Sequence, residues 1–82
     1  MPEKGSVVLV TAGRLFAVLE CSEKDCLLAD GRKRRLDTPK RKNLRHVHLT
    51  ALRLGPEQYA TDRRLRRALA TAAHRDNDTD PE

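Results

Sequence analysis

The segments with a preference for extended structure in the first fifty residues are all short, and turn-forming pairs such as Ala12-Gly13, Asp30-Gly31 and Thr38-Pro39 separate them. Strands this short bury enough apolar surface only if their sheet curls onto itself. A length of 82 residues leaves room for one small domain. We therefore predict a mainly β fold, a small SH3-like antiparallel barrel of about five strands. The predicted strands are Ser6–Thr11, Arg14–Glu20, Cys26–Ala29, Arg32–Leu36 and Asn43–Thr50.

The C-terminal part changes to a helical period. Thr61 suits the N-cap position, and Asp62 suits the positive end of a helix dipole. Apolar residues then recur three and four residues apart, in one narrow stripe that contains Leu65, Ala68, Leu69, Ala72 and Ala73. A short helix of this kind is marginal alone, so we expect it to dock on the barrel or to order on a partner. The predicted organisation is a barrel over 1–54, a linker over 55–60, a helix over 61–75 and a disordered acidic tail over 76–82.

Positive charge is concentrated between Arg32 and Arg45, where eight Lys and Arg residues stand against one acid, Asp37. The whole chain has a net charge of +5, but four acids lie in its last seven residues, and the rest carries about +9. Basic density on strands and turns is fixed in space and suits a polyphosphate backbone. Aromatic residues make up 2% of the chain, so we do not expect stacking platforms for single strands. Phe16, among aliphatic neighbours, is expected in the core. For Tyr59, in the linker, the choice between a packed and a base-stacking position stays open.

The order of these features resembles a known family. The matching segments are Gly5-Ser-Val-Val-Leu-Val-Thr-Ala-Gly13-Arg14, Phe16-Ala-Val-Leu, Leu27-Leu-Ala-Asp-Gly-Arg-Lys-Arg-Arg-Leu, Pro39-Lys-Arg-Lys-Asn-Leu-Arg-His and the helix after Thr61. They are similar to the small bacterial KOW-domain RNA-binding proteins, which are related to eukaryotic-type large-subunit ribosomal protein fourteen. Family members carry a charged loop with a second glycine after the segment that ends here at Arg14. This chain lacks that loop, so its KOW signature is truncated.

The resemblance implies a KOW-type, SH3-like barrel that binds structured RNA, with rRNA of the large ribosomal subunit as the expected partner, and it does not imply catalysis. A small basic barrel also lacks a recognition helix suited to the DNA major groove. Four arginines lie largely off the apolar stripe of the helix, namely Arg63, Arg64, Arg66 and Arg67. The expected RNA-binding residues are Arg14, Arg32, Lys33, Arg34, Arg35, Lys40, Arg41, Lys42, Arg45 and His46, with Arg63, Arg64 and Arg67 as possible additional contacts.

Other functions stay open as alternatives. One is a protein-interaction module that uses the barrel and the Ala/Leu helix, and another is a small DNA-binding regulator. A zinc site built from Cys21, Cys26, His46 and His48 is conceivable, but the cysteine spacing does not demand it, and we predict no metal and no cofactor. No pair of carboxylates or nucleophile–base set marks an enzyme.

No apolar run approaches the roughly 18 residues of a membrane span, and the N-terminus lacks the layout of a signal peptide. We therefore expect a cytoplasmic protein that does not bind membranes, with both cysteines reduced and packed as small apolar residues at strand ends.

Overall fold

The computed structural model describes residues 2–10 and 13–78, with side chains through residue 73. Five strands form one antiparallel sheet, namely β1 (Ser6–Val10), β2 (Leu15–Cys21), β3 (Asp25–Ala29), β4 (Lys40–Asn43) and β5 (Val47–Arg53). A short 3-10 helix, η1 (Leu44–His46), precedes β5, and another, η2 (Pro56–Tyr59), follows it. The chain then enters the helix α1 (Asp62–Asp78).

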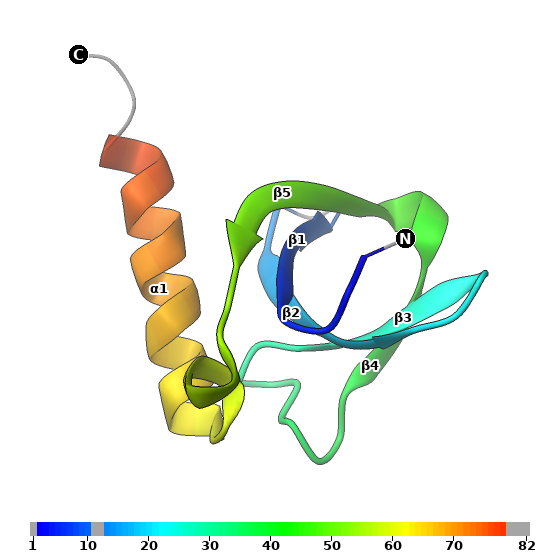
Figure 1. The fold of residues 1–82 in the computed structure, drawn as a ribbon, viewed down its shortest axis with the longest axis horizontal. Coiled ribbons are helices and arrows are strands. Elements are labelled where there is room, and N and C mark those ends of the chain that lie inside the picture. The colour runs from blue at the N-terminus through cyan, green and yellow to red at the C-terminus, as the bar shows by residue number, and fades with distance from the viewer. Residues whose placement is uncertain (1, 11–12, 79–82) are drawn as a thin grey trace.

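The strand order is β4-β3-β2-β1-β5, so the two edge strands are joined in sequence by η1 alone. The sheet curls strongly, so that the edge strand β5 curves round towards the other edge of the sheet. The helix α1 stands outside the curl (Figure 1). The prediction of a mainly β fold, with a five-stranded antiparallel barrel and one C-terminal helix, is confirmed.

Alternate residues of the central strands enter two apolar clusters, because successive side chains of a strand point to opposite faces of its sheet. The inner cluster consists of Val8, Val10, Phe16, Val18, Cys26 and Leu28. The second cluster joins the sheet to the helix and consists of Val7, Ala17, Ala29, Leu54, Leu65 and Leu69. Both faces of the central strands are therefore buried, and Phe16 lies in the core as predicted.

The fourth predicted strand, Arg32–Leu36, is wrong. These residues form a bent loop, and β4 begins only at Lys40. The carboxylate of Asp30 accepts the backbone N–H groups of Arg32 (2.8 Å) and Arg34 (3.1 Å), which a strand would have offered to its neighbour. Gly31 has the positive φ (79°) that the Asp-Gly signal predicts, but it opens a ten-residue connection and not a two-residue hairpin turn. The fifth strand also starts later than predicted, at Val47.

The helix begins as predicted. The Thr61 hydroxyl accepts the backbone N–H of Arg64 (3.1 Å), and this hydrogen bond confirms Thr61 as the N-cap. The helix docks on the barrel with its predicted stripe, since Leu65, Leu69 and Ala72 are buried, whereas Ala73 at the end of the stripe is exposed. α1 extends to Asp78, three residues beyond the predicted helix end at residue 75. Residues 79–82 lie outside the described part, and the 55–60 linker contains η2.

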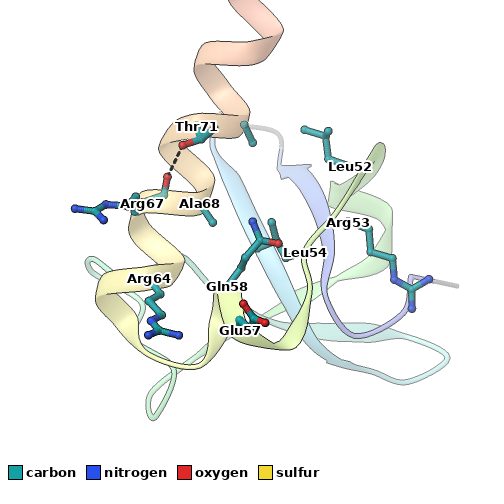
Figure 2. A pocket seen from close by; sticks show the side chains of 10 residues that line it. Leu52, Arg53, Leu54, Glu57, Gln58, Arg64, Arg67, Ala68 and Thr71 are labelled. Carbon is teal, nitrogen blue, oxygen red and sulfur yellow. Dashed lines mark hydrogen bonds between the residues drawn. The ribbon is translucent and has the colours of Figure 1, made fainter.

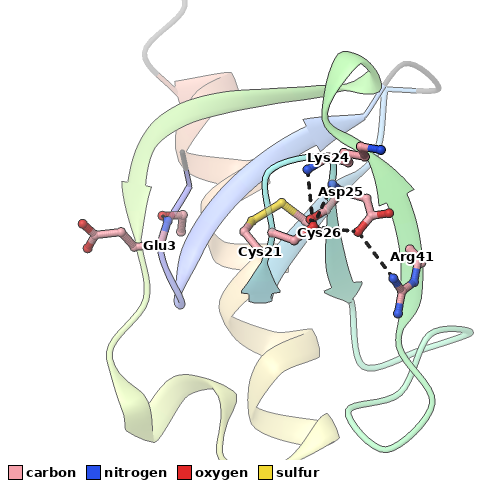
Figure 3. Close-up of a disulfide and its surroundings, with 8 residues drawn as sticks. Glu3, Cys21, Lys24, Asp25, Cys26 and Arg41 are labelled. Atoms are coloured by element: carbon pink, nitrogen blue, oxygen red, sulfur yellow. Dashed lines mark hydrogen bonds and ion pairs between the residues drawn. A yellow bond between two sulfur atoms is a disulfide. The ribbon is translucent and has the colours of Figure 1, made fainter.

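The expectation of reduced cysteines is contradicted. Cys21 and Cys26 form a disulfide, with their Cα atoms 4.1 Å apart (Figure 3). They are register partners at the end of the β2–β3 hairpin, where the Ser22 N–H donates to the Asp25 carbonyl (2.8 Å) and closes a tight turn. The hairpin therefore sets the two cysteines directly opposite each other, at a separation that allows a disulfide to form. Cys26 is also packed in the inner cluster, as expected of a small apolar residue.

Candidate nucleic-acid interface

Two adjoining hollows lie where the N-terminal end of β2 meets the β3–β4 connection and α1. The first, which we call the β4 hollow, has a volume of about 370 Å³. It is lined by Val10, Arg14, Phe16, Leu28, Asp30, Lys33, Arg34, Lys40 and Lys42. The second, the helix-side hollow of about 430 Å³, is lined by Gly13, Arg14, Leu15, Asp30, Arg32, Lys33, Arg66, Leu69, Ala70 and Ala73. Because Arg14, Asp30 and Lys33 line both, we treat the two hollows as one basic groove.

Strand β4 contributes two lysines to the groove through its alternation. Lys40 pairs with Leu28, and Lys42 pairs with Cys26, both residues of the inner cluster. Directly opposed residues of an antiparallel pair share a face of the sheet. The two lysines are half-buried and line the β4 hollow, so the aliphatic stems can lie against the core while the ammonium groups reach water.

Arg41 shows the opposite orientation. It lies between the two lysines in β4, is exposed, and forms an ion pair with Asp25 (3.5 Å) beside the disulfide (Figure 3). The predicted triplet Lys40, Arg41 and Lys42 is thus divided between two faces, because consecutive residues of a strand cannot share one.

The β3–β4 connection supplies three more groove cations, and Asp30 fixes its shape. Besides the two N–H groups that its carboxylate accepts, the backbone N–H of Asp30 and that of Gly31 both donate to the Arg34 carbonyl (2.9 and 3.1 Å). This compact turn holds Arg32, Lys33 and Arg34 at the groove. Asp30, the one acid among the described residues that line the groove, therefore serves to order the loop that carries the cations.

The structure brings seven cations together, namely Arg14, Arg32, Lys33, Arg34, Lys40, Lys42 and Arg66. Four predicted contacts are not among the lining residues of the groove: Arg35, Arg41, Arg45 and His46. Arg35 is exposed in the β3–β4 connection, and Arg41 lies on the other face of β4. Arg45 and His46 belong to η1, which a hydrogen bond from the Leu44 N–H to the Lys24 carbonyl (2.9 Å) holds beside the β2–β3 turn.

The helix arginines divide between two sides of α1. Arg66 lines the groove, although the sequence prediction did not include it among the additional contacts. Arg64 and Arg67 line a separate hollow of about 520 Å³ between α1 and β5, shown in Figure 2, and Arg63 is exposed and lines neither. Helical spacing could have found Arg66, since it lies four residues after Asp62 and three before Leu69, on the side that meets the loop.

The groove is electropositive. In the part of the chain that the structure describes, the ion pairs are Arg41–Asp25 and Arg53–Glu3, so no groove cation is neutralised by one. Seven positive side chains around one carboxylate produce a local potential that attracts anions and that salt screens.

The residues of the conceivable zinc site do not assemble. Both sulfur atoms are committed to the disulfide, and His46 and His48 are exposed on η1 and β5. Over the described ranges, no three His, Cys, Asp or Glu side chains come together in a group that could hold a metal ion. Over the same ranges, no helix has the length and apolar character needed to cross a membrane.

Comparisons with known protein families and with curated proteins find no match to this chain.

Proposed function

We propose that this protein is a non-catalytic module that binds structured RNA through the basic groove. The observation that carries the proposal is the convergence of seven cations from three separate parts of the chain on one concave surface, where Asp30 is the single acid among the described lining residues. Arginine and lysine on a rigid scaffold neutralise phosphates and release their counterions. A merely solvated basic face has no need of concavity or of a carboxylate that orders its loop.

RNA is preferred over duplex DNA for two reasons. The groove is lined mainly by loop and strand residues, and the described residues of α1 that line it are Arg66, Leu69, Ala70 and Ala73, so the proposed binding surface is not a recognition helix of the kind that enters a major groove. Shape and backbone recognition of folded RNA suits such a surface. The resemblance to KOW-domain proteins supports the same choice and adds rRNA of the large subunit as the partner, in a ribosomal or ribosome-associated role.

The burial of the stripe also weakens the alternative of helix pairing with a protein partner. Leu65 is fully buried, and Leu69 and Ala72 are 6% and 8% exposed, so the apolar face that would pair is already covered. RNA binding in the cytoplasm remains part of our proposal, and in that compartment the Cys21–Cys26 disulfide would face a reducing thiol pool.

The test is the salt dependence of binding to a folded rRNA fragment. If about five of the seven groove cations neutralise phosphates, log K should fall against log salt with a slope of roughly −3.5 to −4.5. Sedimentation of cell lysate on sucrose gradients at low and high salt then examines the ribosomal role. Comigration with the large subunit that high salt removes is the expected result. Absence of RNA binding at low salt would contradict the proposed function.

A further inference from the structure

The β4 hollow has a feature that phosphate binding alone does not explain, an apolar floor. Three side chains of the inner cluster reach it, namely Val10, Phe16 and Leu28, which are 6%, 7% and 1% exposed. Five cations stand around this floor. A phosphate group fits the rim but gains nothing from the floor, because the floor offers no hydrogen-bond donor from its side chains.

The size of the hollow narrows the choice of ligand. About 370 Å³ falls within the range of roughly 300–1,000 Å³ that is typical of pockets for small molecules. The bases of an RNA duplex are stacked inside the helix and cannot enter such a hollow, whereas an unpaired base can be splayed out. A splayed nucleotide offers a flat, largely apolar face next to two charged phosphates, which matches an apolar floor within a cationic rim.

We propose that the β4 hollow receives the base of one unpaired nucleotide, a bulged or flipped residue of a structured RNA. The inference rests on the proposed function and defines the RNA feature that the groove recognises. In this proposal the base contacts Phe16 and Val10, and the flanking phosphates lie on the cations that line the same hollow, Lys40 and Lys42 of β4 together with Lys33 and Arg14.

The strand then continues along the groove. Arg14 and Lys33 line both hollows, so a phosphate placed between them leads into the helix-side hollow, where Arg32 and Arg66 follow. One splayed base in a structured RNA needs a single apolar site, and this accords with a chain in which aromatic residues are too few to stack a series of bases.

Three hairpin RNAs with the same stem provide the test, one fully paired, one with a single bulged adenosine and one with an abasic bulge. The abasic control keeps the bulged backbone and removes only the base. We expect the adenosine bulge to bind about tenfold more tightly than either other RNA, the scale of one base contact with an apolar or aromatic site. Equal, salt-dependent affinity for all three would overturn the inference and leave RNA binding intact. No binding of any of them at low salt would instead contradict the proposed function.

Methyl NMR locates the contact without altering the core. The methyl resonances of Val10 and Leu28 should shift with the adenosine bulge and stay unchanged with the abasic bulge, and an R64A/R67A variant, altered outside the groove, should give the same pattern. Affinity that differs between the RNAs without these shifts would overturn the assignment to this hollow.

Adenosine monophosphate alone, which lacks the neighbouring phosphates, should bind at least about a hundredfold more weakly than the bulged hairpin, because it gives up most of the ionic contacts. Equal affinity would assign the hollow to a free nucleotide and overturn the proposal.

Discussion

At the residue scale, Gly31 and Asp62 determine where the basic loop lies. Gly31 is buried against the first turn of α1, and a Cβ atom at this position would overlap the Asp62 carbonyl oxygen and lie 3.0 Å from the Arg66 nitrogen. The Asp62 carboxylate accepts the backbone N–H of Leu36 (2.7 Å), so the loop is hydrogen-bonded to the helix at Leu36 and packed closely against it at Gly31. The Asp62 carboxylate was expected to interact with the positive end of the helix dipole, and it also accepts a hydrogen bond from a backbone group 26 residues away in the chain.

Gly31→Ala should reduce the free energy of unfolding by at least about 2 kcal/mol, since it adds an overlap to the strain of a positive φ. Gly13→Ala is the matched control. Its φ is also positive (84°), but apart from its chain neighbours no atom of the described residues lies within 4 Å of the added Cβ, so a loss of only about 1 kcal/mol is expected. Urea denaturation of both variants measures the difference, and equal losses would show that the close approach to α1 has no energetic weight.

The Asp-Gly pair illustrates what the sequence could predict at this scale. Its positive φ was predictable from the pair itself, because glycine adopts that conformation freely. The contact between Gly31 and α1 was not, since it joins residues 31 and 62 through tertiary packing that no local pattern encodes.

At the element scale, β4 determines which charges serve the groove. The sequence supported five strands and located β1 to β3 within a residue or two, because apolar and β-branched residues mark them. It failed at Arg32–Leu36, where Asp30 captures the backbone N–H groups of the loop. The true β4 consists of three basic residues and an asparagine, with no apolar residue to mark it as a strand. Consequently the density of basic residues was predictable, but their division between two faces was not.

The orientation of β4 leads to a prediction about RNA affinity. K40A/K42A should weaken RNA binding about tenfold at low salt and make the slope of log K against log salt shallower by about two, because two phosphate contacts are lost. R41A/R45A removes the same charge from residues outside the groove and should change the slope by less than about one. Fluorescence anisotropy with a labelled rRNA fragment compares them. Equal effects of the two variants would indicate diffuse charge in place of a groove.

The disulfide stabilises the β2–β3 hairpin. Reduction of the intact protein should lower its free energy of unfolding by about 2 kcal/mol, the amount expected when a bridge closes a loop this short. Chemical denaturation with and without a thiol reductant measures the loss. A C21A/C26A variant provides the control, because the reductant should leave its stability unchanged. A wild-type protein that is insensitive to reductant would contradict a stabilising role for the bridge.

At the scale of the whole molecule, the two apolar clusters share one sheet. Val7 and Val8 are neighbours in β1, yet Val7 packs with α1 and Val8 packs inside the curl. The loss of either cluster therefore exposes one face of the same strand. A domain of this size buries only about 60–65% of its unfolded surface, so its free energy of unfolding is small and depends on both clusters.

One cooperative unfolding transition is therefore expected. Tyr59 packs beside the helix–sheet cluster, and its fluorescence should change at the same denaturant concentration as the far-UV circular dichroism of the sheet and helix. Leu65 is fully buried in the fold. Leu65→Ala should therefore lower the free energy of unfolding by about 2–4 kcal/mol and move both transitions together to lower denaturant concentration. Separate transitions would show that α1 undocks before the barrel unfolds.

The hydrogen bond from Leu36 to Asp62 and the close packing of Gly31 on Asp62 also couple ligand binding in the groove to the docking of the helix. A ligand that holds residues 31–36 still thereby favours the docked position of α1, and a docked α1 favours the ligand by the same coupling free energy. Occupancy at the groove should therefore be visible far from it, as slower amide hydrogen exchange along the first turns of the helix. The helix that stands outside the barrel would in this way report whether the groove is filled.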